Sequence, residues 1–160
     1  CPHDIGLSCG DKHERDDHRL GEPLCPDCYD YTGAVLFNAC APELWRRFTI
    51  TLRRALARNA GLTGQALAAQ IRVSYAKVAG YQRRGVVHFH AIIRLDGPTG
   101  PGSAPPAWAT VALLTAAIAQ AADATHLDTA DAPGLPARTL CWGRTVASVC
   151  RTWAFAIFMP

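Results

Sequence analysis

The stretch Val86-Val87-His88-Phe89-His90-Ala91-Ile92-Ile93-Arg94-Leu95 decides the fold of this chain. It is rich in β-branched and aromatic residues, and this composition predicts a strand over residues 86–95. The side chains of residues 72–81 alternate between the two faces that a strand would have, which predicts a second strand. The connector from Gln82 to Gly85 has the length of a hairpin turn. We therefore predict an antiparallel hairpin.

The two histidines of this strand share one face, because residues two apart in a strand point to the same side, roughly 6–7 Å apart. The opposite face is apolar, at Val87, Phe89, Ala91 and Ile93. We expect that face to pack against helices. Two neutral imidazoles at this spacing can hold one divalent metal and leave positions for a third ligand, water and a phosphate oxygen. Such a metal can polarise a scissile phosphate, although the pair can also simply form hydrogen bonds.

Lys77 is a further candidate for this face. In a tight hairpin it lies roughly opposite His90, where it can contact a phosphate, but a slip of one residue would turn it to the other side. The alternative is a solvated charge on the strand.

The segments around the hairpin predict helices. A helix over Pro42 to Arg58 has Pro and Glu in its first turn. One of its faces is apolar, at Leu44, Trp45, Phe48, Leu52 and Leu56. Thr63 caps a short helix that ends near Gln70. An Ala-rich helix over Pro106 to Asp123 turns Trp108, Val111, Leu114 and Ile118 inward.

A strand at residues 138–142 follows, and residues 143–160 show no clear period. The predicted class is α+β, an antiparallel sheet with the histidine strand central and helices packed on it. The chain begins at Cys1 and shows no leader and no apolar run long enough to span a bilayer, so we expect a cytoplasmic protein without a membrane partner.

Charge is distributed unevenly. Residues 1–31 hold eight acidic side chains against three basic ones, a net charge of −5, whereas residues 32–94 hold nine Arg and one Lys against one Glu, a net charge of +9. A basic middle is typical of a polyanion binder. The candidate DNA-binding residues are Arg46, Arg47, Arg53, Arg54, Arg58, Lys77, Arg83 and Arg84.

The first 31 residues have no apolar period and are dense in Cys and His. Cys25-Pro-Asp-Cys28 is a C-x-x-C sequence of the kind that forms a zinc knuckle. Cys9 and Cys1 would complete a set of four thiolates, with His3, His13 and His18 as alternative ligands. We expect a structural Zn²⁺ here; redox or unliganded cysteines are the alternative.

Three runs of the sequence together carry a resemblance to a known family: residues 20–31 (LGEPLCPDCYDY), residues 44–48 (LWRRF) and residues 81–96 (YQRRGVVHFHAIIRLD). They resemble the replication initiators of actinobacterial rolling-circle plasmids and integrative elements, which are HUH endonucleases. The resemblance covers roughly residues 1–142, and the chain departs from it at Gly143. On this basis we divide the chain into a zinc-binding segment (1–31), a partial core of this class (32–142) and an atypical tail (143–160).

The resemblance implies a nick-and-join enzyme in which His88 and His90 bind Mg²⁺ or Mn²⁺ and a Tyr becomes linked to the 5′ phosphate of single-stranded origin DNA. A host helicase is a possible further partner. In that class the nucleophile lies downstream of the histidines, but no Tyr follows Tyr81 in this sequence. Tyr75 and Tyr81 are weak candidates, better interpreted as residues of the sheet.

We therefore expect an incomplete domain whose parent protein is an endonuclease and which by itself binds metal or DNA better than it cuts. A zinc-containing DNA-binding module without chemistry and a degenerate, inactive fragment are the alternatives.

Overall fold

The computed structural model describes residues 14–18, 22–25, 27–82, 84–143, 147–151 and 154–159. Its main elements follow one another along the chain: α1 (Tyr31–Asn59), α2 (Gly64–Gln70), β1 (Arg72–Tyr81), β2 (Val87–Asp96), α3 (Val111–Ala124), β3 (His126–Asp128), β4 (Thr139–Cys141), β5 (Ala147–Arg151) and β6 (Ala154–Met159). The mixture of helices and antiparallel strands is the α+β class that the sequence predicts.

Helix α1 begins at Tyr31, so the predicted start at Pro42 is wrong. The side chain of Asp30 caps the helix by accepting a hydrogen bond from the backbone N–H of Gly33 at 2.8 Å. Pro42 lies inside the helix. A proline normally disfavours a helix interior, but here Phe37 and its neighbours on the turns before Pro42 pack against the core. Their packing favours a continuous helix.

The hairpin forms as predicted, and β1 has the expected bounds. In its register Val78 lies opposite His90 and Gly80 lies opposite His88. The sheet has the order β1-β2-β6-β5, so β2 has a neighbouring strand on each side. Strands β5 and β6 come from the tail for which the sequence shows no period, and β6 pairs with the edge of β2 that faces away from β1.

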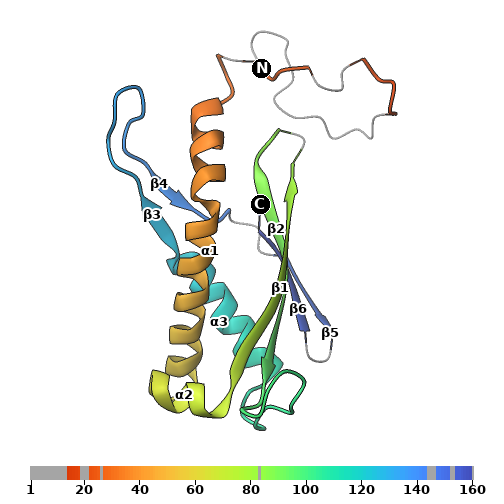
Figure 1. The fold of residues 1–160 in the computed structure, drawn as a ribbon, viewed down its shortest axis with the longest axis vertical. Helices are drawn as coiled ribbons and strands as arrows, with labels where there is room; N and C mark the ends of the chain where they lie inside the picture. The colour runs from red at the N-terminus through yellow and green to blue at the C-terminus, as the bar shows by residue number, and fades with distance from the viewer. Residues whose placement is uncertain are drawn as a thin grey trace.

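Helices α1 and α3 lie on one side of this sheet, and the core lies between them and β2 (Figure 1). The predicted apolar face of α1 and the predicted apolar face of the histidine strand are both buried. Among the large buried side chains are Leu44, Trp45, Phe48, Leu52 and Leu56 from α1, Phe89, Ile93 and Leu95 from β2, and Leu114 and Ile118 from α3. On the other side of the sheet, Val78 and Ile92 are exposed, so neither helix covers that face.

Helices α2 and α3 differ from the prediction mainly at their ends, whereas β3 was not predicted. Thr63 caps α2 as expected, by accepting a hydrogen bond from the N–H of Ala66. Helix α3 begins at Val111 instead of Pro106, because Thr110 is its cap. Trp108 lies before the helix and is half-buried, with its indole N–H donating to Gln70. Strands β3 and β4 form a separate two-stranded sheet. No helix among the described residues is both long and apolar enough to cross a bilayer.

Candidate metal and nucleic-acid site

His88 and His90 converge on the open face of the sheet. Their Nε2 atoms lie 2.8 Å apart, and their rings meet at an interplanar angle of 72° with centroids 4.7 Å apart. His88 is half-buried and His90 is exposed. Both nitrogens therefore face the same small volume above β2, and solvent or a ligand can reach it.

Gly80 provides the space in which the His88 ring lies. It is the direct partner of His88 across the hairpin, and a Cβ atom at this position would lie 2.9 Å from Cε1 and 3.0 Å from Nε2 of His88. Real Cβ atoms essentially never lie closer than 3.0 Å to such an atom, so a side chain at this position would require the imidazole of His88 to shift. The absence of a side chain on β1 thus allows His88 to lie across the neighbouring strand.

The donor set fits a divalent metal in part. Two ligand atoms bound at about 2.1 Å to one octahedral ion lie roughly 3 Å apart, close to the separation of these two Nε2 atoms. The same separation is that of a hydrogen bond between the two rings. No third His, Cys, Asp or Glu of the described residues joins them in a cluster of metal ligands. The ring N–H opposite the metal usually donates a hydrogen bond, whereas Nδ1 of His88 is buried and has no such partner within the described part of the chain.

Lys77 does not lie on the histidine face. The prediction placed it opposite His90, but the register pairs it with Ala91, and the alternation of the strand turns it toward α1. Its ammonium nitrogen lies 3.8 Å from the centroid of the Phe89 ring and 5.3 Å from that of Trp45. Desolvation by burial lowers the pKa of Lys77. This lysine therefore makes cation–π contacts on the core side of the sheet.

The two candidate tyrosines also lie on the helix side, because they are an even number of residues from Lys77 on the same strand. Tyr75 packs edge-on against Trp45 with ring centroids 5.3 Å apart, and Tyr81 lies at the end of β1 and is 73% exposed. Neither shares a face with His88 and His90. Their positions agree with the interpretation as residues of the sheet.

The predicted basic residues of α1 differ in their surroundings. Glu43 accepts hydrogen bonds from both Arg46 and Arg47, which together lower its pKa to about 2, and Arg47 also donates to the backbone of His126. The next three arginines are exposed: Arg53, Arg54 and Arg58. Arg84 is exposed at the tip of the hairpin, and Arg83 lies outside the described residues. The basic surface is thus partly neutralised near Glu43 and not farther along the helix.

Cys25 and Cys28 lie on one tight turn, as a zinc knuckle requires. The backbone N–H groups of Cys28 and Tyr29 both donate to the carbonyl of Cys25, at 3.2 and 2.9 Å. Cys25 is buried and Cys28 is exposed. Four of the other proposed ligands, Cys1, His3, Cys9 and His13, lie outside the described residues, whereas His18 is exposed and its Nδ1 lies 3.7 Å from a carboxylate oxygen of Asp17. The turn is connected to the hairpin, because the Tyr29 hydroxyl donates to the carbonyl of Arg84 at 2.8 Å.

Sequence reasoning missed Gly80 and Asn38. A glycine inside a strand pattern signals close approach by another group, and this signal was available at Gly80. Asn38 of α1 donates to the carbonyl of Gly85 and accepts from the N–H of Val87, each at 2.8 Å. It fastens the start of the histidine strand to the helix. No local pattern indicates this role, since the partners are distant in the sequence.

A family model described as "RepSA: Replication initiator protein, pSAM2" matches residues 1–150. The chain belongs to this family of replication initiator proteins, and the resemblance seen in the sequence motifs is confirmed. A replication initiator protein from Streptomyces ambofaciens is 55% identical over 137 residues, which cover 84% of this chain. The same alignment covers 30% of the length of that relative. No solved structure matches the chain.

Proposed function

We propose that this chain is part of a replication initiator that nicks one strand of its origin DNA, with His88 and His90 as ligands of the required Mg²⁺ or Mn²⁺. The observation that carries the proposal is the convergence of the two Nε2 atoms on an open, accessible face of the sheet. A strand of DNA can approach that face because Val78 and Ile92 beside the pair are exposed. Membership of the initiator family supports DNA as the substrate class.

In the proposed reaction, the hydroxyl oxygen of a tyrosine attacks the scissile phosphorus. The bond between the phosphorus and the 3′ oxygen breaks, the 3′ oxygen takes up a proton, the tyrosine gives one up, and the 5′ phosphate stays linked to the tyrosine. The divalent metal would stabilise the charge that develops on the phosphate oxygens. The role of His88 and His90 is to bind and orient that metal as neutral imidazoles.

We place the nucleophile outside these 160 residues. All four tyrosines of the chain lie at or before position 81, and the two on β1 face away from the histidines. The relative from Streptomyces ambofaciens extends well beyond the aligned part. The chain by itself should therefore bind metal without forming a covalent link to DNA.

The test uses the full-length protein and a supercoiled plasmid that carries its origin. Wild-type protein with Mn²⁺ should convert the plasmid to the nicked form and become covalently attached to DNA. The double variant His88→Ala/His90→Ala should lose both activities and, as the isolated chain, should lose Mn²⁺ binding in calorimetry. His126→Ala is the matched control, because His126 is exposed on β3 and its side chain is not part of the pair. Nicking that survives in the double variant would refute the proposal.

A structural Zn²⁺ in the head of the chain is a separate proposal, supported by the turn between Cys25 and Cys28. Zinc removal should then loosen the contact of Tyr29 with the hairpin tip. Under the alternative of a zinc-containing DNA-binding module without chemistry, DNA binding would fail on zinc chelation but survive loss of the His pair. DNA binding by the His88→Ala/His90→Ala variant and its His126→Ala control, measured with and without a zinc chelator, therefore distinguishes the enzyme from the binding module.

A further inference from the structure

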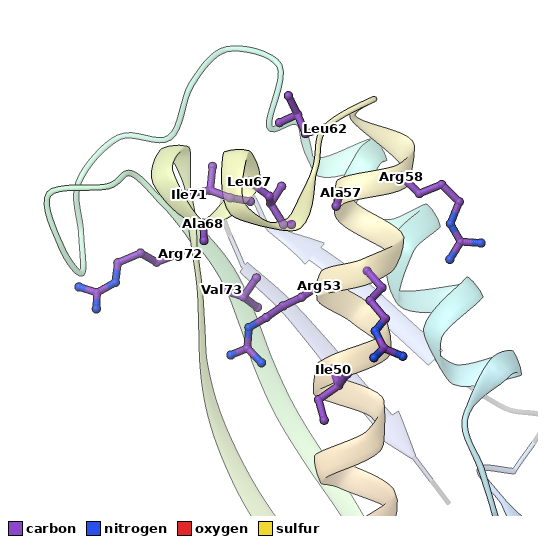
Figure 2. Close-up of a pocket in the computed structure, with 12 residues that line it drawn as sticks. Ile50, Arg53, Ala57, Arg58, Leu62, Leu67, Ala68, Ile71, Arg72 and Val73 are labelled. Atoms are coloured by element: carbon purple, nitrogen blue, oxygen red, sulfur yellow. The ribbon is translucent and has the colours of Figure 1, made fainter.

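An open groove of about 930 Å³ lies between the second half of α1, helix α2 and the first residues of β1 (Figure 2). Most of the residues that line it are aliphatic, and they come from all three elements: Ile50, Ala57, Leu62, Leu67, Ala68, Ile71 and Val73. Leu67 and Ile71 are also buried members of the core, so the floor of the groove is continuous with the packed interior. A ligand bound here would meet a fixed apolar surface.

Four arginines line the same groove: Arg53, Arg54, Arg58 and Arg72. All four are exposed, and no acidic side chain lines the groove. Within the described part of the chain, none of them pairs with a carboxylate, whereas Arg46 and Arg47 share Glu43 and Arg138 pairs with Asp30. The positive charge around this groove is therefore not neutralised and is available to an acidic ligand.

The groove is distant from the histidine pair. Arg72 begins β1 and Gly80, which contacts His88, lies eight residues farther along, a separation of roughly 26 Å in a strand. Ala57 and Leu67 reach the groove from the helix side of the sheet, whereas the histidines face away from the helices. Single-stranded DNA bound at the His pair and running along β2 would therefore stay on the opposite face of the sheet and would not enter this groove.

We propose that this groove binds an acidic, amphipathic helical segment of a partner protein. Apolar side chains spaced one turn apart on such a helix would lie on the aliphatic floor, and its flanking carboxylates would pair with the arginines of the rim. Recognition of this kind needs both an apolar floor and a charged rim, and the groove has both. The proposal does not depend on the metal site and assigns Arg53, Arg54 and Arg58 to a protein partner instead of to DNA.

Nucleic acid fits the same groove less well. Proteins that bind single strands through their bases use aromatic side chains for stacking, and no aromatic residue lines this groove. Duplex DNA would offer phosphates to the arginines but nothing for the aliphatic floor. The combination of floor and rim therefore favours a peptide, and DNA binding is a competing outcome of the test.

The probe is a fluorescein-labelled model helix of about five turns, with Leu and Phe along one face and Glu along the other. Fluorescence anisotropy should show that the isolated chain binds it, and that it binds a scrambled peptide of the same composition at least about tenfold more weakly. Ala68→Trp should fill the groove and weaken binding at least about tenfold. Ala69→Trp is the matched control, since Ala69 is exposed on the same helix but does not line the groove.

Charge is tested with the double variant Arg53→Ser/Arg72→Ser against Arg84→Ser, an exposed arginine at the hairpin tip. The double variant should weaken binding of the acidic helix and the control should not, with circular dichroism confirming that each variant folds. Equal binding of the scrambled peptide, or binding that Ala68→Trp leaves unchanged, would overturn the proposal. So would an oligothymidylate that binds wild-type chain, displaces the peptide and is itself blocked by Ala68→Trp.

Discussion

The imidazole of His88 lies directly over Gly80, its partner across the β1–β2 hairpin, at a distance that leaves no room for a Cβ atom. The position of the Nε2 atom of His88, 2.8 Å from that of His90, therefore depends on a missing side chain on the neighbouring strand. This relationship makes Gly80 a positioning residue for the proposed metal site.

We predict that Gly80→Ala lowers the Mn²⁺ affinity of the chain by about tenfold or more, the usual effect of disturbing a residue that orients a metal ligand. An alanine would otherwise be favourable in a strand, so any loss of stability comes from the displaced ring. Calorimetric titration with Mn²⁺ measures the affinity, and thermal unfolding without metal measures the stability. Ala76→Val is the control, because Ala76 is exposed and lies opposite Ile92. Unchanged affinity in Gly80→Ala would show that the ring does not need this space.

Lys77 is predicted to stabilise the fold and to have no part in DNA cleavage. Its ammonium group lies over Phe89 and near Trp45, so Lys77→Ala should lower the free energy of unfolding by about 0.5–2 kcal/mol. Nicking by the full-length protein should remain at the wild-type level at a temperature where both proteins are folded. Chemical denaturation and the plasmid assay together test the two statements. A strong loss of nicking without a loss of stability would place Lys77 at the phosphate after all.

Glu43 gives a prediction about pH. Hydrogen bonds from Arg46 and then Arg47 lower its pKa to about 2 from the ordinary value of 4.5. A lowered pKa in the folded state means that the carboxylate contributes its full stabilisation above pH 4.5 and loses it as the pH falls toward 2. Wild-type protein should therefore be more stable than Glu43→Gln at neutral pH. The difference in melting temperature should shrink steadily below pH 4.5, and a difference that stays constant down to pH 2 would contradict the assignment.

The sequence allowed prediction of those parts whose signals are local. Thr63 as a helix cap, the apolar face of α1 and the hairpin all depend on residues close together in the chain, and each is confirmed. The face of the sheet on which Lys77 lies was predicted wrongly, because it depends on the register between β1 and β2. A change of one residue in the length of the turn shifts that register and reverses the face. Strands β5 and β6 were missed because their own composition does not indicate strands. They join the sheet through the pairing of β6 with β2, which is distant in the sequence.

Both ends of the Asn38 amide form hydrogen bonds with the β1–β2 hairpin. Nδ2 donates to the carbonyl of Gly85, and Oδ1 accepts from the N–H of Val87, which begins the histidine strand. Asn38→Ala removes both partners and should destabilise the chain by about 1–3 kcal/mol. Asn38→Asp retains the acceptor for Val87 but places a carboxylate oxygen against the carbonyl of Gly85, so it should also be less stable than the wild-type chain.

Hydrogen exchange distinguishes this local role from a general loss of helix stability. In Asn38→Ala the amide of Val87 should exchange much faster than in wild type, while the amides of α1 near Leu52 should change little. Ala39→Ser, an exposed neighbour on the same helix, is the control for a polar substitution without a hairpin contact. If the amide of Val87 kept its wild-type protection in Asn38→Ala, the hairpin would be held by its strand pairing alone, and the start of the histidine strand would not depend on α1.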